Sequence, residues 1–335
     1  MTNTGKAVMV LFNVEKSRFG GVNSMQSQAK RIRGFPATGR GNQKKARLKH
    51  MVKIVRKKVL NPSVTLLEVE APLIARKAQA GQFIILRVDE HGERIPLTIA
   101  DYDREKGTVT IIFQKVGLTT ELLGDLNEGD SIRDFVGPLG LPTELPEGAK
   151  RVCVVGGGVG CAIAYPQAKS LHAQGIGVDV IAGFRSKDIV ILEEEFKAAC
   201  DNLYITTDDG SYMEKGFVTD KLKSLIDAGN QYDAVIAIGP IPMMKFVSAV
   251  TKPYGIKTMV SLNPIMIDGT GMCGGCRVTV GGKMKFACVD GPDFDGHEVD
   301  FDELMSRNTV YRGEEAEEKQ RHACRMDELA KEMIH

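Results

Sequence analysis

The strongest restriction on the fold of this chain comes from an apolar run that leads directly into a glycine turn. Residues 151–155 are RVCVV, residues 156–160 are GGGVG, and a helical stretch, CAIAYPQAKSLHAQ, follows at residues 161–174. A buried strand that passes through a turn into a helix is typical of a parallel α/β unit. Further strand patterns follow at 177–184, 202–207, 232–239 and 257–262, with helical stretches at 193–200 and 218–228. The sequence therefore predicts a Rossmann-like domain with a doubly wound parallel sheet over residues 148–262.

The glycine turn also predicts a nucleotide site. Glycines between a strand and a helix let backbone N–H groups approach a pyrophosphate, which makes Gly156, Gly157, Gly158 and Gly160 candidate ligands. The motif departs from G-x-G-x-x-G because Cys161 stands at the last glycine position.

The second strand does not end in an acidic residue that could bind a ribose diol. Asp179 lies at about the expected distance but inside the strand, where a structural role is at least as good an explanation. Arg185 and Lys187 carry charge that suits a 2′-phosphate, and they could equally be solvated surface residues. Spacing alone therefore leaves NAD and NADP open.

Residues 51–147 have a different pattern, with short β-rich runs at 64–70, 81–88, 107–114 and 130–140 separated by Gly, Asp, Asn and Pro turns. This spacing predicts a small antiparallel β-barrel. Within it, two segments combine a guanidinium, hydroxyls and a stiffened backbone that could bind a flavin; they comprise Arg94, Pro96, Leu97 and Thr98, and then Gly117, Thr119 and Thr120. Turns of this composition are also common without a ligand.

The segment from residue 263 to residue 335 begins with a metal-ligand pattern, Asp268-x4-Cys273-x2-Cys276-x11-Cys288. This is the plant-type iron–sulfur spacing with Asp in the first ligand position. Two alternatives stay open: Asp268 could form an Asp-Gly turn while Cys324 supplies the fourth ligand, and the set could bind zinc. The spacing and the many glycines favour a [2Fe-2S] domain, followed by a charged helical tail from Phe301. The remaining cysteines, Cys153, Cys161 and Cys200, are expected to be small packing residues.

Charge is distributed unevenly along the 335 residues. Residues 1–50 hold eleven basic residues and one acidic residue, whereas the remainder has 33 basic and 42 acidic residues. The folded protein is therefore expected to begin near Met51, after a basic N-terminal extension that is disordered or a leader. No apolar run reaches the roughly 20 residues that span a bilayer. We expect a cytoplasmic protein without a membrane or nucleic-acid partner.

The order of these motifs resembles the ferredoxin reductase-like family in its branch with a C-terminal cluster. The runs SLNPIMIDGTGMCGGCRV at 261–278, TTDDGS at 206–211 and GPIPMM at 239–244 further resemble the small subunits of NADH-dependent reduced ferredoxin:NADP oxidoreductases, also called sulfide dehydrogenase β subunits. Those subunits carry Asp in the first ligand position. The dihydroorotate dehydrogenase electron-transfer subunits have a similar layout with Cys there, so Asp268 argues against them.

The resemblance implies which residues hold each cofactor. It implies FAD at the two barrel segments and NAD(H) over residues 156–160, although the charge of Arg185 would suit NADP. Asp209, Gly239 and Pro240 would lie at the nicotinamide side. The family favours NADH in this subunit and places NADP(H) and ferredoxin on a larger flavoprotein and iron–sulfur subunit.

The implied reaction is electron transfer. Hydride carries two electrons and an iron–sulfur cluster accepts one, whereas a flavin exchanges either number. We therefore expect electrons to pass from NADH to FAD to the cluster, and then to the larger subunit of an electron-bifurcating transhydrogenase, without a catalytic acid or base. The alternatives are a dihydroorotate dehydrogenase electron-transfer subunit, a stand-alone NAD(P)H diaphorase and, more remotely, a zinc-containing nucleotide sensor.

Overall fold

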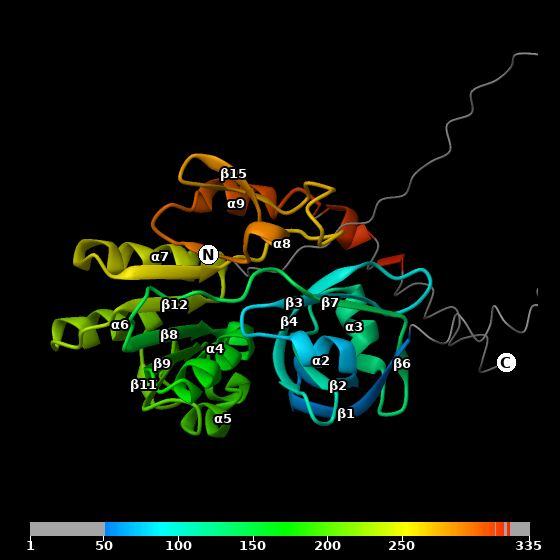
Figure 1. Cartoon of the computed structure of the whole chain (residues 1–335), viewed down its shortest axis with the longest axis horizontal. Helices are drawn as coiled ribbons and strands as arrows, with labels where there is room; N and C mark the ends of the chain where they lie inside the picture. Colours follow the sequence, from blue (N-terminus) through cyan, green and yellow to red (C-terminus); the bar gives the residue numbers. More distant parts are fainter. Residues whose placement is uncertain (1–50, 312, 318–319, 322–335) are drawn as a thin grey trace, which may run out of the picture.

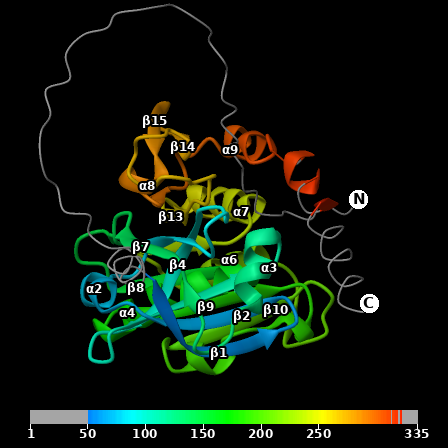
Figure 2. The same ribbon diagram turned by 90° about the vertical axis from the view of Figure 1, so that its right-hand side faces the viewer.

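The structure, a computed structural model, describes residues 51–311, 313–317 and 320–321. The predicted N-terminal extension, Cys324 and the end of the predicted tail lie outside these residues. Within them the chain forms a β-barrel, a parallel-sheet domain and a C-terminal segment that lies against both (Figures 1 and 2).

The barrel is a seven-stranded antiparallel sheet in the order β6-β1-β2-β5-β4-β3-β7. Its strands are β1 (Val52–Asn61), β2 (Val64–Glu70), β3 (Phe83–Arg87), β4 (Ile95–Asp103), β5 (Thr108–Gln114), β6 (Ser131–Ile132) and β7 (Asp134–Leu139). Two helices accompany them, α2 (Pro72–Lys77) and α3 (Leu118–Asp125). Alternating apolar residues of these strands fill one core, which includes Ile54, Leu67, Ile84, Ile111 and Phe113.

One stretch of chain closes the barrel. β6 pairs with β1 at one edge of the sheet, and β7 pairs with β3 at the other edge. Only Arg133 separates β6 from β7, and its N–H donates to the carbonyl oxygen of Val88 at 3.2 Å. The two edge strands therefore hold the sheet in a nearly closed antiparallel barrel, as the strand spacing predicted.

The second domain has the strand order β11-β10-β9-β8-β12-β13-β16, and every pair up to β13 is parallel. Its strands are β8 (Arg151–Gly157), β9 (Gly177–Phe184), β10 (Asn202–Thr207), β11 (Glu214–Lys215), β12 (Ala234–Ile238) and β13 (Lys257–Ser261). Its helical elements are η1 (Gly158–Gly160), α4 (Cys161–Ala173), η2 (Lys187–Ile189), α5 (Glu193–Lys197), α6 (Val218–Asp227), α7 (Ile241–Thr251) and η3 (Lys252–Tyr254). Strand order reverses between β8 and β12, and this reversal is where parallel sheets of this type bind ligands.

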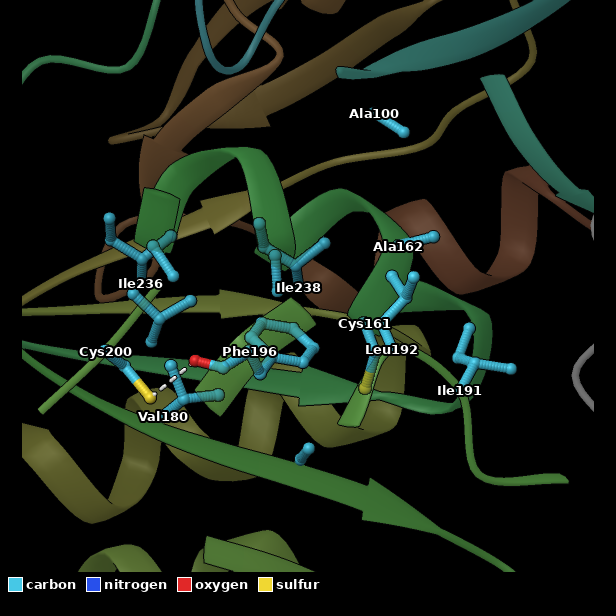
Figure 3. Close-up of a cluster of buried hydrophobic side chains, with 14 of the residues drawn as sticks. Ala100, Cys161, Ala162, Val180, Ile191, Leu192, Phe196, Cys200, Ile236 and Ile238 are labelled. Atoms are coloured by element: carbon cyan, nitrogen blue, oxygen red, sulfur yellow. Dashed lines mark hydrogen bonds between the residues drawn. The ribbon is translucent and has the colours of Figure 1, made fainter. Parts of the chain in front are cut away.

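Apolar side chains pack on both faces of the parallel sheet. One core lies under α4 and α5 and contains Cys161, Phe196 and Cys200 (Figure 3). The other lies under α6 and α7 and contains Cys153. The Cys200 thiol donates to the carbonyl oxygen of Phe196 at 3.0 Å. All three cysteines are buried, which confirms their predicted packing role.

The C-terminal segment contains a hairpin, two short helices and one further strand. These elements are β14 (Arg277–Val280), β15 (Lys283–Phe286), α8 (Ala287–Asp290), β16 (Asp293–Asp295) and α9 (Phe301–Arg307). β16 pairs antiparallel with β13, so this segment completes the sheet of the preceding domain. The division of the chain at residues 147 and 262 stays a prediction, as does a helical tail that continues to the end of the chain.

None of the helices in the described ranges is long and apolar enough to cross a bilayer.

Candidate redox site

The predicted nucleotide residues meet at one edge of the parallel sheet. Gly156 and Gly157 end β8, Gly239 and Pro240 follow β12, and Arg185 follows β9. Because the strands are parallel, their carboxyl ends lie along the same edge, at the point where strand order reverses.

Close packing explains why the turn contains glycines. A Cβ atom at Gly160 would lie 2.5 Å from the carbonyl oxygen of Ile238 and 2.8 Å from the Cα atom of Gly239. A Cβ atom at Gly156 would lie 2.9 Å from the Cys161 sulfur. Gly158 has a φ of +57° and open space where a Cβ would be. The turn therefore lies directly on the end of β12, and its open side is at Gly158.

The loops after β9 and β10 are joined by hydrogen bonds that backbone N–H groups donate. Asp209 N–H donates to the carbonyl oxygen of Arg185 at 3.2 Å, and Lys187 N–H donates to the Ser211 hydroxyl at 2.9 Å. Hydrogen bonds from the Ser211 hydroxyl and N–H lower the pKa of Asp209. Both Arg185 and Asp209 are exposed at this end of the strands.

One hydroxyl beside this turn has no partner in the described part of the chain. Thr206, near the end of β10, is 2% exposed, and its Oγ1 atom makes no hydrogen bond. A Cβ atom at Gly183 would lie 3.3 Å from this oxygen and 3.7 Å from the carbonyl oxygen of Gly156. A buried hydroxyl without a partner beside a glycine turn is consistent with a polar ligand at this edge. Sequence reasoning did not single out Thr206, although it begins the TTDDGS run.

Asp179 has a structural role. Its carboxylate is 1% exposed and accepts hydrogen bonds from Arg151 Nη2 at 2.9 Å, Asn202 Nδ2 at 2.8 Å and the Tyr232 hydroxyl at 2.6 Å. Burial alone would raise the pKa of Asp179, but these hydrogen bonds together lower it. Its side chain lies within the sheet among these partners, so it is not a ribose ligand.

The predicted flavin segments meet on the barrel. Arg94 precedes β4, and Pro96, Leu97 and Thr98 lie on this strand opposite β3. Pro96 and Thr98 are half-buried on one face, whereas Leu97 packs against the barrel core. Because side chains alternate along a strand, Pro96 and Thr98 are directed away from the barrel core and Leu97 toward it.

The second flavin segment forms the start of α3. Thr119 is buried and its hydroxyl donates to Glu93 Oε2 at 3.1 Å, which joins α3 to the residue before Arg94. The Thr120 hydroxyl accepts the N–H groups of Val116 and Gly117, both at 3.0 Å, and donates to the carbonyl oxygen of Gly117 at 2.9 Å. Thr120 therefore caps the helix, and open space beside Gly117 leaves room for a ligand.

The segment of the metal-ligand pattern, residues 268–288, is called the cysteine loop below. It brings two thiols together. The sulfur atoms of Cys276 and Cys288 are 3.2 Å apart and both residues are buried. Burial raises the pKa of Cys288, the hydrogen bond with Cys276 raises it further, and the nearby Cys273 thiol adds to the effect. Gly275 N–H points at the Cys273 sulfur at 3.5 Å, and a hydrogen bond from Gly271 N–H to Cys288 acts in the opposite direction on its pKa. Backbone donors directed at sulfur are the usual surroundings of an iron–sulfur cluster.

Asp268 lies in the same loop but bonds locally. Its Oδ2 atom accepts the N–H of Thr270 at 3.1 Å and also accepts the Thr270 hydroxyl. Within the ranges that the structure describes, no three His, Cys, Asp or Glu side chains converge on a point suited to one metal ion. The thiols of Cys276 and Cys288 are thus brought together, with Cys273 nearby, while the Asp268 carboxylate bonds to Thr270.

The flavin segment and the cysteine loop are in direct contact. Arg94 Nε donates to the carbonyl oxygen of Ile267, the residue before Asp268, at 2.9 Å. A Cβ atom at Gly269 would lie 2.6 Å from Ile85 Cδ1 and 2.9 Å from Leu139 Cδ1, so the loop packs on β3 and β7 of the barrel. A one-electron carrier in this loop would lie beside a flavin on the barrel.

Comparison with known proteins agrees with this arrangement. Residues 263–300 match the iron–sulfur cluster binding domain of dihydroorotate dehydrogenase B. The chain is 49% identical over 247 residues to a Thermotoga maritima homologue of the electron-transfer subunit of dihydroorotate dehydrogenase B, covering 74% of this chain and 86% of the relative. It is 58% identical to an uncharacterized protein of Clostridium beijerinckii, covering 79% and 92% of the two chains.

A solved structure described as NADH-dependent reduced ferredoxin-NADP oxidoreductase contains a chain 45% identical to this one. The two superpose with a TM-score of 0.78 over 82% of this chain and 98% of that chain. The chain belongs to the family of ferredoxin reductase-like electron-transfer subunits. This confirms the resemblance predicted from the motifs.

Membership in this family settles the general chemistry. The electron-transfer subunit is part of an oxidoreductase, and its cofactors are FAD, NAD(H) and an iron–sulfur cluster. The match to the cluster-binding family covers residues 263–300, within the segment that the sequence predicted to hold the cluster. The zinc-sensor interpretation has no support, because residues 263–300 match a cluster-binding family.

Proposed function

We propose that this subunit passes electrons from NADH through FAD to a [2Fe-2S] cluster, and then to a larger flavoprotein partner, as in NADH-dependent ferredoxin:NADP oxidoreductases that bifurcate electrons. The observation that carries the proposal is the contact between Arg94 and Ile267, which joins the flavin segment to the start of the cysteine loop. Proximity matters because electron transfer needs neighbouring carriers and no proton donor.

The barrel would hold FAD. We assign this role to Arg94, Pro96, Leu97 and Thr98 together with Gly117, Thr119 and Thr120. Arg94 has one hydrogen bond in the described structure, through Nε, so its remaining N–H groups are available to a phosphate. Leu97 would contribute by packing and Thr120 by holding the start of α3, as their contacts indicate.

The edge of the parallel sheet would hold NAD(H). We assign the dinucleotide to Gly156, Gly157, Gly158, Gly160, Arg185, Asp209, Gly239 and Pro240. The glycine turn would offer backbone N–H groups to the pyrophosphate at Gly158, where there is open space. The protein's contribution is then to orient the nicotinamide toward the flavin and to exclude water.

The cluster ligands would be Asp268, Cys273, Cys276 and Cys288. Two thiolates on one tetrahedral metal lie about 3.8 Å apart for metal–sulfur bonds of about 2.3 Å, so the sulfur atoms of Cys276 and Cys288, which are 3.2 Å apart, would separate slightly to share one iron. A two-iron cluster takes its ligands as two pairs, whereas a zinc ion needs all four at one point. The separate pair of thiols therefore favours [2Fe-2S], with Cys273 and Asp268 as the second pair.

A second function is supported by the family model and by several relatives. The relatives are electron-transfer subunits of dihydroorotate dehydrogenase B, and the subunit from Fusobacterium nucleatum is 36% identical to this chain. The family model describes the cluster domain of the same enzyme. Asp268, in place of the Cys expected there, favours the first function. Mixing the subunit with each type of partner and assaying either dihydroorotate or NADPH and ferredoxin would distinguish the two.

Cofactor content tests the proposal directly. Anaerobically purified protein is expected to contain two irons, two sulfides and one FAD per chain, with an absorption spectrum that NADH bleaches faster than NADPH. Zinc without flavin would contradict the proposal. Faster bleaching by NADPH would show that NADPH is the electron donor, and the assignments of FAD and the cluster would still hold.

A further inference from the structure

Two arginines hold consecutive carbonyl groups of the cysteine loop. Arg277 Nη1 donates to the carbonyl oxygen of Gly274 at 3.3 Å, and Arg307 Nη2 donates to the carbonyl oxygen of Gly275 at 3.3 Å. These carbonyls belong to the last two of the three peptide units between Cys273 and Cys276. Neither arginine belongs to the predicted cofactor sites.

The earlier of these two peptide units faces a predicted ligand. The Gly274 carbonyl and the Gly275 N–H belong to the same peptide, and that N–H points at the Cys273 sulfur at 3.5 Å. In a trans peptide the C=O and N–H point in opposite directions. A guanidinium that holds the carbonyl on one side therefore keeps the N–H directed at sulfur on the other side, and polarises it.

Arg307 reaches the loop from a firmly packed helix. Phe301 and Leu304 of α9 are buried in the same core as Cys276 and Cys288. The helix is capped by Asp300, whose carboxylate accepts the N–H of Glu303 at 2.9 Å. The position of Arg307, the last residue of α9, is therefore fixed by a helix that packs in the same core as Cys276 and Cys288.

The two guanidinium groups also lie close to each other. Burial lowers the pKa of Arg307, the charge of Arg277 lowers it further, and the charge of Glu303 opposes the shift, while an arginine side chain stays positive in a protein. Glu303 is one negative charge beside two positive ones, so a further anion at the loop would be favourable. Thiolate and carboxylate ligands around iron would provide that anion, and each electron accepted would add one more negative charge.

We propose that Arg277 and Arg307 are positioning residues that direct the loop peptides at cluster sulfur and raise the reduction potential of the cluster. Positive charge and N–H donors stabilise the reduced cluster more than the oxidised one, because the reduced form carries more negative charge. The inference rests on the proposed [2Fe-2S] cluster. It adds a reason why an electron from the flavin would move to this loop.

Substitution of each arginine in the full chain tests the proposal. Arg277→Gln and Arg307→Gln keep a polar side chain but remove the charge. Each is expected to lower the equilibrium constant for cluster reduction about tenfold, which is about 59 mV for a one-electron couple. The measurement is a redox titration followed by the electron paramagnetic resonance signal of the reduced cluster. Arg277→Lys and Arg307→Lys should shift less in the same direction.

Arg104→Gln is the matched control. Its Nη2 donates to the carbonyl oxygen of Ala78 at 3.0 Å in the barrel, so the variant loses the same kind of bond away from the loop. It should keep the parent potential. Absence of a cluster from the parent protein would defeat the proposed function itself. A parent cluster whose potential is unchanged in both Gln variants would overturn only the role of the arginines.

Two further outcomes are also decisive. A folded Gln variant that keeps FAD but loses its iron, while Arg104→Gln retains iron, supports the positioning role. If a Gln variant does not accumulate as folded protein, the corresponding Lys variant decides. A lowered potential in that variant supports the proposal, and the parent potential overturns it.

Discussion

Asp268 differs from the three cysteines of its loop because it offers oxygen instead of sulfur, and its carboxylate accepts the N–H of Thr270. As a ligand it would have to exchange that hydrogen bond for iron, and an oxygen donor is harder than a thiolate. The local bond and a ligand role are compatible, since a carboxylate has two oxygen atoms and the bonds to Thr270 use Oδ2 alone.

Removing the Asp268 carboxylate is expected to destabilise the cluster. Asp268→Ala should lose most of its iron and sulfide while it retains FAD, and Asp268→Cys should keep a cluster with a different potential. Asp89→Ala is a matched control, because Asp89 accepts the N–H of His91 at 2.8 Å in the same kind of turn within the barrel. A cluster spectrum that is unchanged in Asp268→Ala would remove Asp268 from the ligand set.

A single methyl group at Gly160 should weaken both stability and nucleotide binding. The added Cβ would press on the carbonyl oxygen of Ile238, and backbone there cannot move cheaply. Gly160→Ala is expected to cost about 2 kcal/mol of unfolding free energy, the usual range for overpacking, and to weaken NADH binding. Urea unfolding and fluorescence titration measure these two effects. Gly313→Ala, which meets no atom within 4 Å, should behave like the parent in both.

Among the secondary-structure elements, strands with regular apolar patterns were the most predictable. The predicted segments at 64–70, 177–184 and 202–207 coincide with β2, β9 and β10. Each is a short β-rich run bounded by turn residues, so local pattern and tertiary position agree. β4 was not predicted, because Pro96 and the flavin-binding pattern at its start indicated a ligand turn rather than a strand.

Elements that depend on distant partners were not predictable. β16 has three residues and exists because β13 offers an open edge to them. α7 begins between Pro240 and Pro242, a sequence that is also typical of a turn. The contact of Arg94 with Ile267 spans 173 residues, and no local pattern indicates it. The ligand types were therefore evident from the sequence, whereas the proximity of the flavin segment and the loop required the fold.

The hydrogen bonds of Asp179 join β9 to the strands on both sides. Arg151 begins β8, Asn202 begins β10, and Tyr232 precedes β12. Asp179→Asn is therefore expected to reduce the unfolding free energy by about 2 kcal/mol, since it removes a charged acceptor from three donors, one of which is the buried Tyr232 hydroxyl. Urea unfolding at pH 7 measures this loss.

This contribution should depend on pH in one direction. The folded state lowers the pKa of Asp179 below 3.8, so the stabilisation is present above 3.8 and is lost as the pH falls through the lower, folded-state value. The parent should approach the Asn variant in stability in strong acid. An equal difference between the two proteins at pH 7 and in strong acid would contradict the assignment.

At the scale of the whole molecule, one buried carboxyl group connects three regions. Asp293 of β16 accepts the Thr143 hydroxyl from the segment between the domains, and Gln167 of α4 donates to the same hydroxyl. Asp293 Oδ1 has no hydrogen-bond partner among the described residues. Burial raises the pKa of Asp293, although hydrogen bonds from Thr143 and Ser261 oppose the rise.

Neutralising this group should stabilise the protein. A raised folded-state pKa means that Asp293 favours folding below pH 3.8 and loses that contribution as the pH rises through its folded-state value. Asp293→Asn should therefore gain about 1 kcal/mol at pH 7, and the gain should shrink as the pH falls toward 3.8. Urea unfolding across this pH range is the measurement. A less stable Asn variant at pH 7 would show that the carboxylate is favourable where it lies.

The pairing of β16 with β13 has a consequence for how electrons travel. The segment that carries the cysteines contributes β16 to the sheet of the second domain. It also accepts a hydrogen bond from Arg94 of the barrel. In some redox proteins a tethered carrier domain moves between donor and acceptor, and a more viscous solvent slows their electron transfer. Here the distance between carriers would be set by the folded structure itself, so glycerol should leave the rate of internal electron transfer unchanged.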